Sequence, residues 1–352
     1  MTDVLQKLLE TRPWLLADGA TGTNLFDMGL QTGDAPELWN VDYPDRVARH
    51  YKNFIDAGSD IILTNSFGGS AYRLKLHHAQ DRVTELNSAA VRIARAQADQ
   101  ADRTVVVAGS MGPTGEILEP VGALTQGEAK SAFAEQARAL KEGGADVLWI
   151  ETMSSKEEVI AAVAGAGAVD LPVVVTLSID TNGRTMMGLT PAEAVALQKE
   201  LSPTPLACGA NCGIGAAELV AAIVNMSKAA EQCGSSPIIV AKANCGIPEY
   251  VEGKIVYNGT PELMADYACL AYDAGATIIG GCCGTTPEHI YRMREALERH
   301  QRGSTPPVNV ITERLGEVST GARAQLRGEM SVQAGASGAI ASRRPSRRRR
   351  RG

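Results

Sequence analysis

Two adjacent cysteines, Cys282 and Cys283, follow the apolar run TIIGG and stand in the stretch GGCCGTTPEHI at residues 280–290. Neighbouring cysteines are poorly placed to form an ordinary disulfide with each other. Their thiolates can, however, hold one soft metal ion if a third ligand arrives from elsewhere in the fold. The spacing alone leaves open a second interpretation, in which both are small buried residues of a tight glycine turn.

Cys212, at the end of the run PLACGANC, is the candidate for a third thiol, and Cys245 in KANC is a rival. Cys208, Cys233 and Cys269 are interpreted as small apolar residues. Three thiolates suit zinc, and three protein ligands leave one coordination position open, as in catalytic sites. Because three negative sulfurs weaken the metal as a Lewis acid, activation of a thiol substrate is a better use of this site than hydrolysis.

Eight apolar runs, mostly rich in β-branched residues, alternate with helix-like segments. The runs occupy residues 14–19, 60–66, 104–110, 146–152, 172–178, 205–212, 237–245 and 277–283. Continuous apolar runs are typical of parallel strands that are buried on both faces. Eight strand–helix units predict an α/β fold, a (β/α)8 TIM barrel over residues 1–303. An open doubly wound sheet is the alternative, but DGATGTN after the first strand lacks the G-x-G-x-x-G spacing.

The charge of the chain is divided unevenly. The formal net charge is −6, yet the last ten residues, RRPSRRRRRG, carry seven arginines, so the rest stands at −13. Such an acidic body argues against a general nucleic-acid binder. We expect residues 304–352 to form a flexible extension with a disordered, arginine-rich end. With no apolar run of about 20 residues and no signal-peptide pattern at the start, we expect a cytoplasmic protein without a membrane span.

Polar residues and thiols stand where the expected strands end. In a TIM barrel these carboxyl ends meet at one mouth, where function resides. The residues concerned are Asp18, Gly19, Thr64, Glu151, Asn211, Cys212, Asn244, Cys245, Cys282 and Cys283. Each has an ordinary explanation as a loop polar group or a helix cap, but their shared level around one ring indicates a site.

Five motifs resemble the homocysteine S-methyltransferase domain, and they occur in the same order. They are DGATGTNL at 18–25, TNSFGGS at 64–70, WIET at 149–152, GANCG at 209–213 and GGCCGTTPEHI at 280–290. The resemblance implies that Cys212, Cys282 and Cys283 bind Zn²⁺, with the homocysteine sulfur taking the open position as a thiolate. It implies further that Asp18 and Glu151 hold the substrate ammonium and that backbone groups of Gly19 and Thr64 meet its carboxylate.

The methyl donor is less well indicated. An onium donor such as betaine or S-methylmethionine prefers an aromatic cage, but Gly68 and Thr152 stand where the betaine enzymes carry aromatic residues. Trp39 is then the expected wall, with Tyr72 a weaker candidate. The run DTNGRTMMGLTP at 180–191 is closer to the methionine-synthase module, for which a separate cobalamin-carrying protein would be the partner.

Two further alternatives remain open at this point. One is a non-catalytic zinc- or thiol-binding protein that is tethered by its basic tail. The other concerns the fourth position on zinc at rest, for which water and Asn211 are the candidates, because Thr152 replaces a tyrosine that can fill it in the betaine enzymes.

Overall fold

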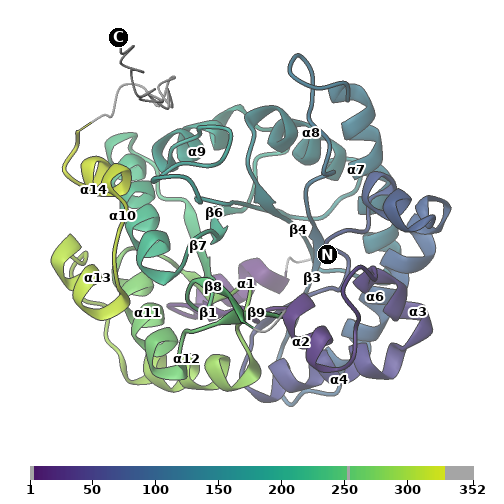
Figure 1. Ribbon diagram of the computed structural model, residues 1–352, viewed down its shortest axis with the longest axis horizontal. Helices are drawn as coiled ribbons and strands as arrows, with labels where there is room; N and C mark the ends of the chain where they lie inside the picture. Colours follow the sequence, from purple (N-terminus) through teal and green to yellow (C-terminus); the bar gives the residue numbers. More distant parts are fainter. Residues whose placement is uncertain (1–3, 252–253, 330–352) are drawn as a thin grey trace, which may run out of the picture.

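Eight parallel strands form the centre of the computed structural model, which describes residues 4–251 and 254–329 (Figure 1). Hydrogen bonds join them in the order β1-β10-β7-β6-β5-β4-β3-β2, and the bridge between Ala17 and Ile61 brings the two outer strands together. The ring confirms the predicted TIM barrel and excludes an open doubly wound sheet. The strands are β1 (Leu15–Leu16), β2 (Ile61–Leu63), β3 (Val106–Met111), β4 (Val147–Met153), β5 (Val173–Leu177), β6 (Ala207–Cys212), β7 (Ile238–Ala243) and β10 (Ile278–Gly281).

A ring of helices surrounds the strands (Figure 1). Several of them begin with a threonine whose hydroxyl caps the first turn, as Thr125, Thr190 and Thr260 do, which satisfies an otherwise unpaired N–H group. The ring helices are α4 (Pro44–Asp56), α6 (Val83–Ala98), α7 (Gln126–Gly143), α8 (Lys156–Ala166), α9 (Pro191–Leu197), α10 (Ala216–Gln232), α11 (Pro261–Asp273) and α12 (Pro287–Arg299). Short helices in the loops are α2 (Gly22–Asp27), α3 (Trp39–Asp42) and α5 (Ala71–Leu74), together with 3₁₀ turns at Pro36–Leu38, Lys75–His77, Gln80–Arg82 and Gln198–Glu200.

The apolar core has two layers. The larger one lies between the strands and the ring helices, and the smaller one fills the barrel with inward-facing residues such as Trp149 and Val240. Helix α1 (Val4–Thr11), which the sequence did not predict, adds Leu5 to the inner layer. Figure 1 shows α1 behind the centre of the barrel, so it covers the end opposite the carboxyl ends of the strands.

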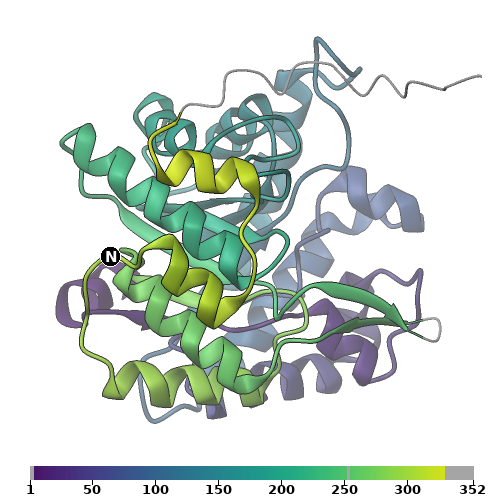
Figure 2. The same ribbon diagram turned by 60° about the vertical axis from the view of Figure 1, so that its left-hand side comes forward.

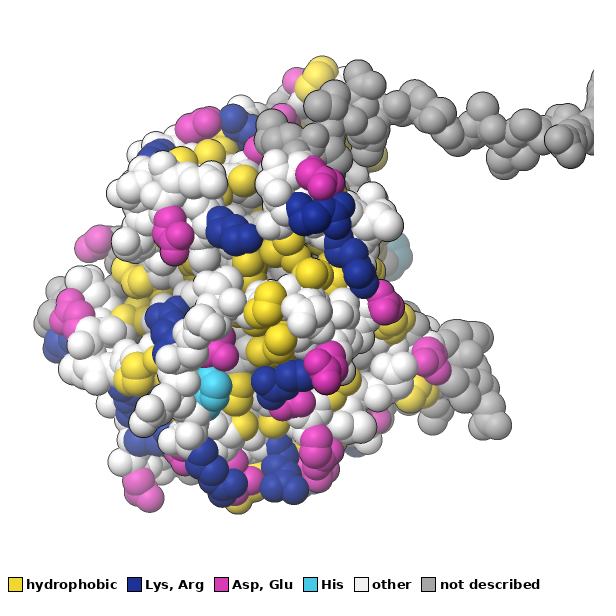
Figure 3. Space-filling view, turned by 90° about the vertical axis from the view of Figure 1, so that its left-hand side faces the viewer, with side chains coloured by type: hydrophobic (Ala, Val, Ile, Leu, Met, Phe, Trp, Pro, Cys, Tyr) yellow, Lys and Arg dark blue, Asp and Glu magenta, His cyan; other side chains and the backbone are white. Residues whose placement is uncertain are grey.

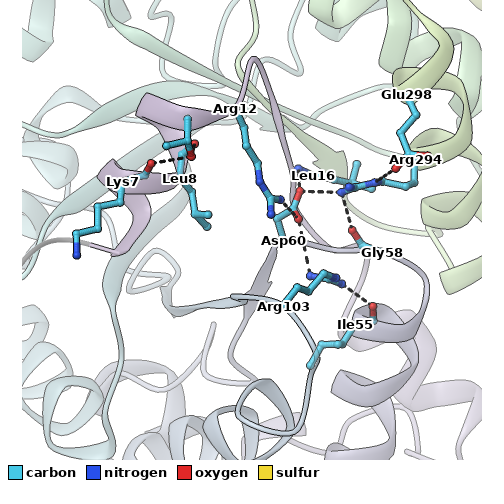
Figure 4. A network of polar contacts seen from close by, with 11 residues as sticks. Lys7, Leu8, Arg12, Leu16, Ile55, Gly58, Asp60, Arg103, Arg294 and Glu298 are labelled. Carbon is cyan, nitrogen blue, oxygen red and sulfur yellow. Dashed lines mark hydrogen bonds and ion pairs between the residues drawn. The ribbon is translucent and has the colours of Figure 1, made fainter.

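Two buried carboxylates stabilise the seam between β1 and β2, where strand pairing is shortest. At one end, Asp60 accepts a hydrogen bond from the N–H of Leu16 (3.0 Å) and forms ion pairs with Arg12 (2.6 Å), Arg294 (3.0 Å) and Arg103 (3.7 Å) (Figure 4). At the other end, Asp18 accepts from the N–H of Leu63 (2.7 Å). Side chains thus replace ladder bonds that these short strands do not make.

Helices α13 (Val308–Leu315) and α14 (Thr320–Leu326) correct the expectation of a flexible extension from residue 304. Helix α13 lies against α10 and α11, and α14 lies against α10 (Figure 2). Ile311 and Ala322 are buried there, and Glu218 of α10 accepts hydrogen bonds from the N–H (2.9 Å) and hydroxyl (2.6 Å) of Ser319. An apolar stripe and a capped start therefore order this segment. The arginine-rich end predicted to be disordered lies outside the described residues.

The outer face over α10, α11, α13 and α14 mixes basic and acidic side chains (Figure 3). Arg323 pairs with Glu317 and Arg327 with Glu329 (2.8 Å) near the end of the described chain. Within residues 4–251 and 254–329, none of the helices combines the length and the apolar character that crossing a membrane requires.

An antiparallel hairpin of β8 (Pro248–Val251) and β9 (Lys254–Tyr257) follows β7 and was not predicted from the sequence. Figure 2 shows it projecting from the barrel. Its last residue, Tyr257, returns toward the loop after β10, because a Cβ placed on Gly284 would lie 2.3 Å from the Tyr257 Cγ atom. The hairpin therefore brings an aromatic ring next to the paired cysteines.

Candidate functional site

Three cysteines converge at the mouth of the barrel. The Sγ atoms of Cys212, Cys282 and Cys283 all lie within 4.8 Å of one another. Cys212 is the last residue of β6, whereas the other two directly follow β10, so the cluster reaches across β7. The structure thus brings together the three thiols that the sequence analysis selected.

The cluster has the dimensions of a tetrahedral zinc site. Zn–S bonds of about 2.3 Å give sulfur–sulfur edges of about 3.8 Å, and the sulfurs of Cys212 and Cys283 are 4.0 Å apart. The hydrogen bond with Cys282, together with burial, raises the pKa of Cys212 to about 12. The hydrogen bond with Cys212, together with burial, raises the pKa of Cys283 to about 11. Three thiolates therefore repel one another here unless a cation lies between them, which fits a metal centre.

Two asparagines hold the cysteine loops in place. Asn211 accepts hydrogen bonds from the Thr152 N–H (2.8 Å) and the Thr176 hydroxyl (2.7 Å), while its amide nitrogen donates to the Thr152 hydroxyl (2.7 Å) and lies 3.8 Å from the Cys282 sulfur. Asn244 accepts from the Cys283 N–H (3.1 Å) and donates to the Gly213 carbonyl (2.6 Å). The loops after β6 and β10 are therefore tied to each other and to β4.

Cys245, the rival ligand, is engaged elsewhere. Its sulfur lies 3.2 Å from the Gly259 carbonyl and 3.1 Å from Nε2 of His289. The described residues that could hold a metal do not include it. Of the cysteines interpreted as small apolar residues, Cys208 and Cys269 are buried, whereas Cys233 is exposed.

Asp18 forms a buried ion pair that the sequence analysis missed. Its Oδ1 atom lies 2.8 Å from Nζ of Lys242, which also donates to the Asp18 carbonyl (2.9 Å). Burial raises the pKa of Asp18, and the charge of Lys242 opposes that rise. Lys242 lies on β7, and the signal for it was a lysine inside the otherwise apolar run PIIVAKANC. A buried lysine requires a partner, and the structure identifies it.

Glu151 lies near the end of β4 and retains an open side. One of its oxygens accepts a hydrogen bond of 2.5 Å from the Ser110 hydroxyl, and the other has no hydrogen-bond partner among the described residues. Glu151 is 8% exposed, compared with 1% for Asp18. Burial raises the pKa of Glu151, whereas Lys242 and Ser110 lower it and Asp18 raises it further. The two predicted acids thus lie close enough to influence each other, but only Glu151 keeps a carboxylate oxygen without a hydrogen-bond partner among the described residues.

The two residues expected near a substrate carboxylate, Gly19 and Thr64, differ in whether their backbone N–H group is already hydrogen-bonded. The N–H of Gly19 has no hydrogen-bond partner in the described part of the chain, and a Cβ there would lie 2.6 Å from the Thr285 carbonyl. In contrast, the N–H of Thr64 donates to the Ala108 carbonyl (2.9 Å), and its hydroxyl accepts from the Ser110 N–H (3.0 Å). Gly19 therefore offers a free backbone donor, whereas the backbone N–H of Thr64 is already used.

Two predicted aromatic residues and one unpredicted aromatic residue lie in segments between the barrel strands. Trp39 is buried, and its ring contacts Tyr43 (5.0 Å between centroids) and the Arg46 guanidinium (5.0 Å). At Gly68, where betaine enzymes carry an aromatic residue, a Cβ would lie 2.9 Å from an oxygen of Glu37. Tyr72 is half-buried. Tyr257 was missed because it belongs to the unpredicted hairpin, and burial together with the nearby Cys283 raises its pKa.

Together, the fold and the site define a TIM-barrel protein with a three-cysteine metal-type centre beside buried acids. A family model described as homocysteine S-methyltransferase matches residues 15–297. The chain belongs to the homocysteine S-methyltransferase family.

Relatives and solved structures are consistent with this assignment. The methionine synthases of Mycobacterium leprae (strain TN) and Mycobacterium tuberculosis (strain ATCC 25618 / H37Rv) are each 30% identical to the chain, over 321 and 317 residues. The matches cover 87% and 86% of this chain but 26% of each relative, so the chain spans about a quarter of their length. The homocysteine methyltransferase MmuM from Escherichia coli, in its metallated form, matches at a TM-score of 0.68 and 25% identity, over 83% of this chain and 99% of that one.

Proposed function

We propose that this chain is a zinc-dependent homocysteine S-methyltransferase, which transfers a methyl group from an onium donor of the betaine type to the sulfur of homocysteine and so forms methionine. The observation that carries the proposal is the group of three thiols within 4.8 Å of one another at the mouth of the barrel. Thiolate ligands suit the binding and activation of another thiol better than they suit hydrolysis.

We expect each end of a zwitterionic amino acid to meet a matching group at the mouth of the barrel. Zinc held by Cys212, Cys282 and Cys283 would supply an open position at which a thiol loses its proton at neutral pH. The free oxygen of Glu151 can accept from the substrate ammonium, and the free N–H of Gly19 can donate to its carboxylate. Two fixed contacts at one end of a short substrate orient the sulfur at the other, which is the main requirement of an in-line transfer.

The choice of an onium donor rests on the likeness to MmuM and on the aromatic residues. The match to the homocysteine methyltransferase MmuM, which covers 99% of that chain, favours a donor that the barrel itself binds. Tyr257 adjoins the cysteine loop through Gly284, and its ring can form one wall of a cage for a methylated cation. Trp39 stays a predicted second wall.

A second candidate function is homocysteine activation within a split cobalamin-dependent methionine synthase. The 30% identity to two mycobacterial methionine synthases, confined to 26% of their length, favours it. In that case the methyl group comes from a cobalamin-carrying protein that docks at the mouth. The two candidates share homocysteine and the metal site, and they differ in the donor.

Methionine formation with isotopically labelled donors tests the proposal. Zinc-loaded protein kept under reductant is mixed with homocysteine and CD₃-labelled betaine or S-methylmethionine, without cobalamin, and the product is analysed by mass spectrometry. We expect labelled methionine, and we expect Cys283→Ser to lose zinc and turnover together, whereas Cys233→Ser, an exposed cysteine outside the cluster, keeps both. No labelled methionine with either donor, followed by turnover with a methylcobalamin-loaded partner protein, would establish the second candidate instead.

A further inference from the structure

Lys242 is the buried cation nearest to the proposed substrate pocket, and nothing in the proposed reaction uses it. Its side chain is 2% exposed and lies on β7, between the strands that carry the three cysteines. Both hydrogen bonds that its Nζ makes in the described structure go to Asp18, one to the carboxylate (2.8 Å) and one to the carbonyl (2.9 Å). A lysine ammonium is rarely buried unless it has such a partner.

The ion pair changes what Asp18 can do. One carboxylate oxygen is bonded to Lys242 and the other to the N–H of Leu63 (2.7 Å), and the residue is 1% exposed. Asp18 is therefore paired with a cation, hydrogen-bonded at both carboxylate oxygens and buried. Glu151 differs from Asp18 in hydrogen bonding and in exposure. It has an oxygen without a hydrogen-bond partner among the described residues, and its exposed fraction is greater.

The three charged side chains at this site carry a net charge of −1. Asp18 and Glu151 contribute two negative charges and Lys242 one positive charge, so the three side chains leave one unpaired negative charge at Glu151. A substrate ammonium would neutralise it. In an interior of low dielectric constant, such a match of single charges contributes strongly to selectivity, whereas an extra cation would repel the ammonium.

We propose that Lys242 is a positioning residue for homocysteine: it neutralises Asp18, so that the substrate ammonium is received by Glu151 rather than shared between the two acids. This inference rests on the proposed function. It assigns the two acids different tasks, with Asp18 serving the barrel seam and the pocket floor and Glu151 selecting thiols that carry an ammonium group.

A charge-compensation experiment separates this arrangement from direct binding by Asp18. Homocysteine binding to zinc-loaded protein is measured by calorimetry for Asp18→Asn and for Asp18→Asn combined with Lys242→Met. The single substitution leaves the lysine charge unpaired, so we expect homocysteine to bind about tenfold more weakly. Removing that charge in the double variant should recover most of the loss. If Asp18 itself receives the ammonium, the double variant will bind no better than Asp18→Asn, which would overturn the proposal.

4-Mercaptobutanoate, which lacks the amino group, is the matched probe for a purely structural effect. Its binding should not weaken in Asp18→Asn, and an equal loss for both ligands would contradict the charge argument. Glu151→Gln provides a second route if the double variant does not fold. This substitution should weaken homocysteine binding about 10- to 100-fold and leave the binding of 4-mercaptobutanoate unchanged. Any other pattern overturns the proposal. Failure of the unaltered protein to bind homocysteine would overturn the proposed function as well.

Discussion

Asp60 offers the sharpest test of how the barrel is closed. It is fully buried where β1 meets β2, and three arginines from three different segments surround its carboxylate (Figure 4). The substitution Asp60→Asn keeps the shape of the side chain and an oxygen that can accept from the Leu16 N–H. It removes the negative charge, so that the three guanidinium groups lose their common partner and face one another.

The size of the effect follows from burial on the two sides of these ion pairs. Breaking a buried ion pair by removing one partner costs about 3–5 kcal/mol, because the other charge stays behind. Here the carboxylate is 0% exposed, but the side chains of Arg12, Arg103 and Arg294 are 31%, 28% and 25% exposed. Water therefore solvates the arginines in part, and the estimate belongs at the low end of that range. We expect the free energy of unfolding to fall by about 3 kcal/mol.

Urea unfolding followed by both circular dichroism and tryptophan fluorescence measures this loss, provided that the two transitions coincide. Asp56→Asn is the matched control, because Asp56 pairs with Lys52 at the surface with both side chains 59% exposed, and we expect it to cost under about 0.5 kcal/mol. Homocysteine binding should be unchanged in Asp60→Asn, since the residue lies at the end of the seam away from the mouth. A loss below about 1 kcal/mol, or one equal to that of the control, would refute the view that this carboxylate closes the barrel.

Three further predictions concern other parts of the chain. Burial lowers the pKa of His50 from 6.5 to about 4, so between these pH values the unfolded state binds a proton that the folded state does not. The contribution of His50 to the free energy of unfolding should be complete above pH 6.5 and should fall on the order of 3 kcal/mol as the pH drops to 4. His50→Leu should remove most of this fall in unfolding curves measured at the two pH values. Gly284→Ala should lower zinc affinity at least about tenfold in a chelator competition. Gly284 has φ of +78°, and a Cβ there would lie 2.3 Å from Tyr257. Gly22→Ala, whose new Cβ would have nothing within 4 Å, should leave zinc affinity unchanged. Ending the chain after residue 303 should lower the free energy of unfolding by several kcal/mol, because it exposes the face on which Ile311 and Ala322 are buried. Ending the chain after residue 329 should leave thermal unfolding and methyl transfer unchanged. Equal effects of the two truncations would contradict this account.

The sequence was informative where one signal decided the outcome. Apolar runs located all eight barrel strands, and the rule that the carboxyl ends of parallel strands meet at one mouth placed Cys212 beside Cys282 and Cys283. It was uninformative where the outcome depended on partners far away in the chain. The pairing of Lys242 with Asp18 requires the inward direction of a residue on β7, and the order of residues 308–326 requires the complementary face of α10. Neither is encoded in a local pattern.

The strand-end conformations show why some features of the site cannot be predicted from residue types. Thr152 and Cys212 both have positive φ, +63° and +62°. Residues other than glycine seldom adopt this region, and the β-branched Thr152 disfavours it most. Asn211 offsets the cost for Thr152 by bonding to its N–H and its hydroxyl at once (2.8 and 2.7 Å). The register between β4 and β5 shifts at the same place, between Ile150 and Met153. The strain is therefore local to the site and is held there by one amide.

That amide also bears on the fourth position of a metal in the cysteine cluster. The Thr152 N–H can only donate, so the Asn211 atom 2.8 Å from it must be the carbonyl oxygen, and the Thr176 hydroxyl bonds to the same oxygen (2.7 Å). The group that faces the Cys282 sulfur at 3.8 Å is consequently the NH₂. An amide nitrogen that carries two protons is a hydrogen-bond donor to thiolate and not a metal ligand. Of the two candidates for the fourth metal position at rest, this geometry therefore disfavours Asn211 and favours water. The NH₂ group of Asn211 instead stabilises negative charge on the Cys282 sulfur.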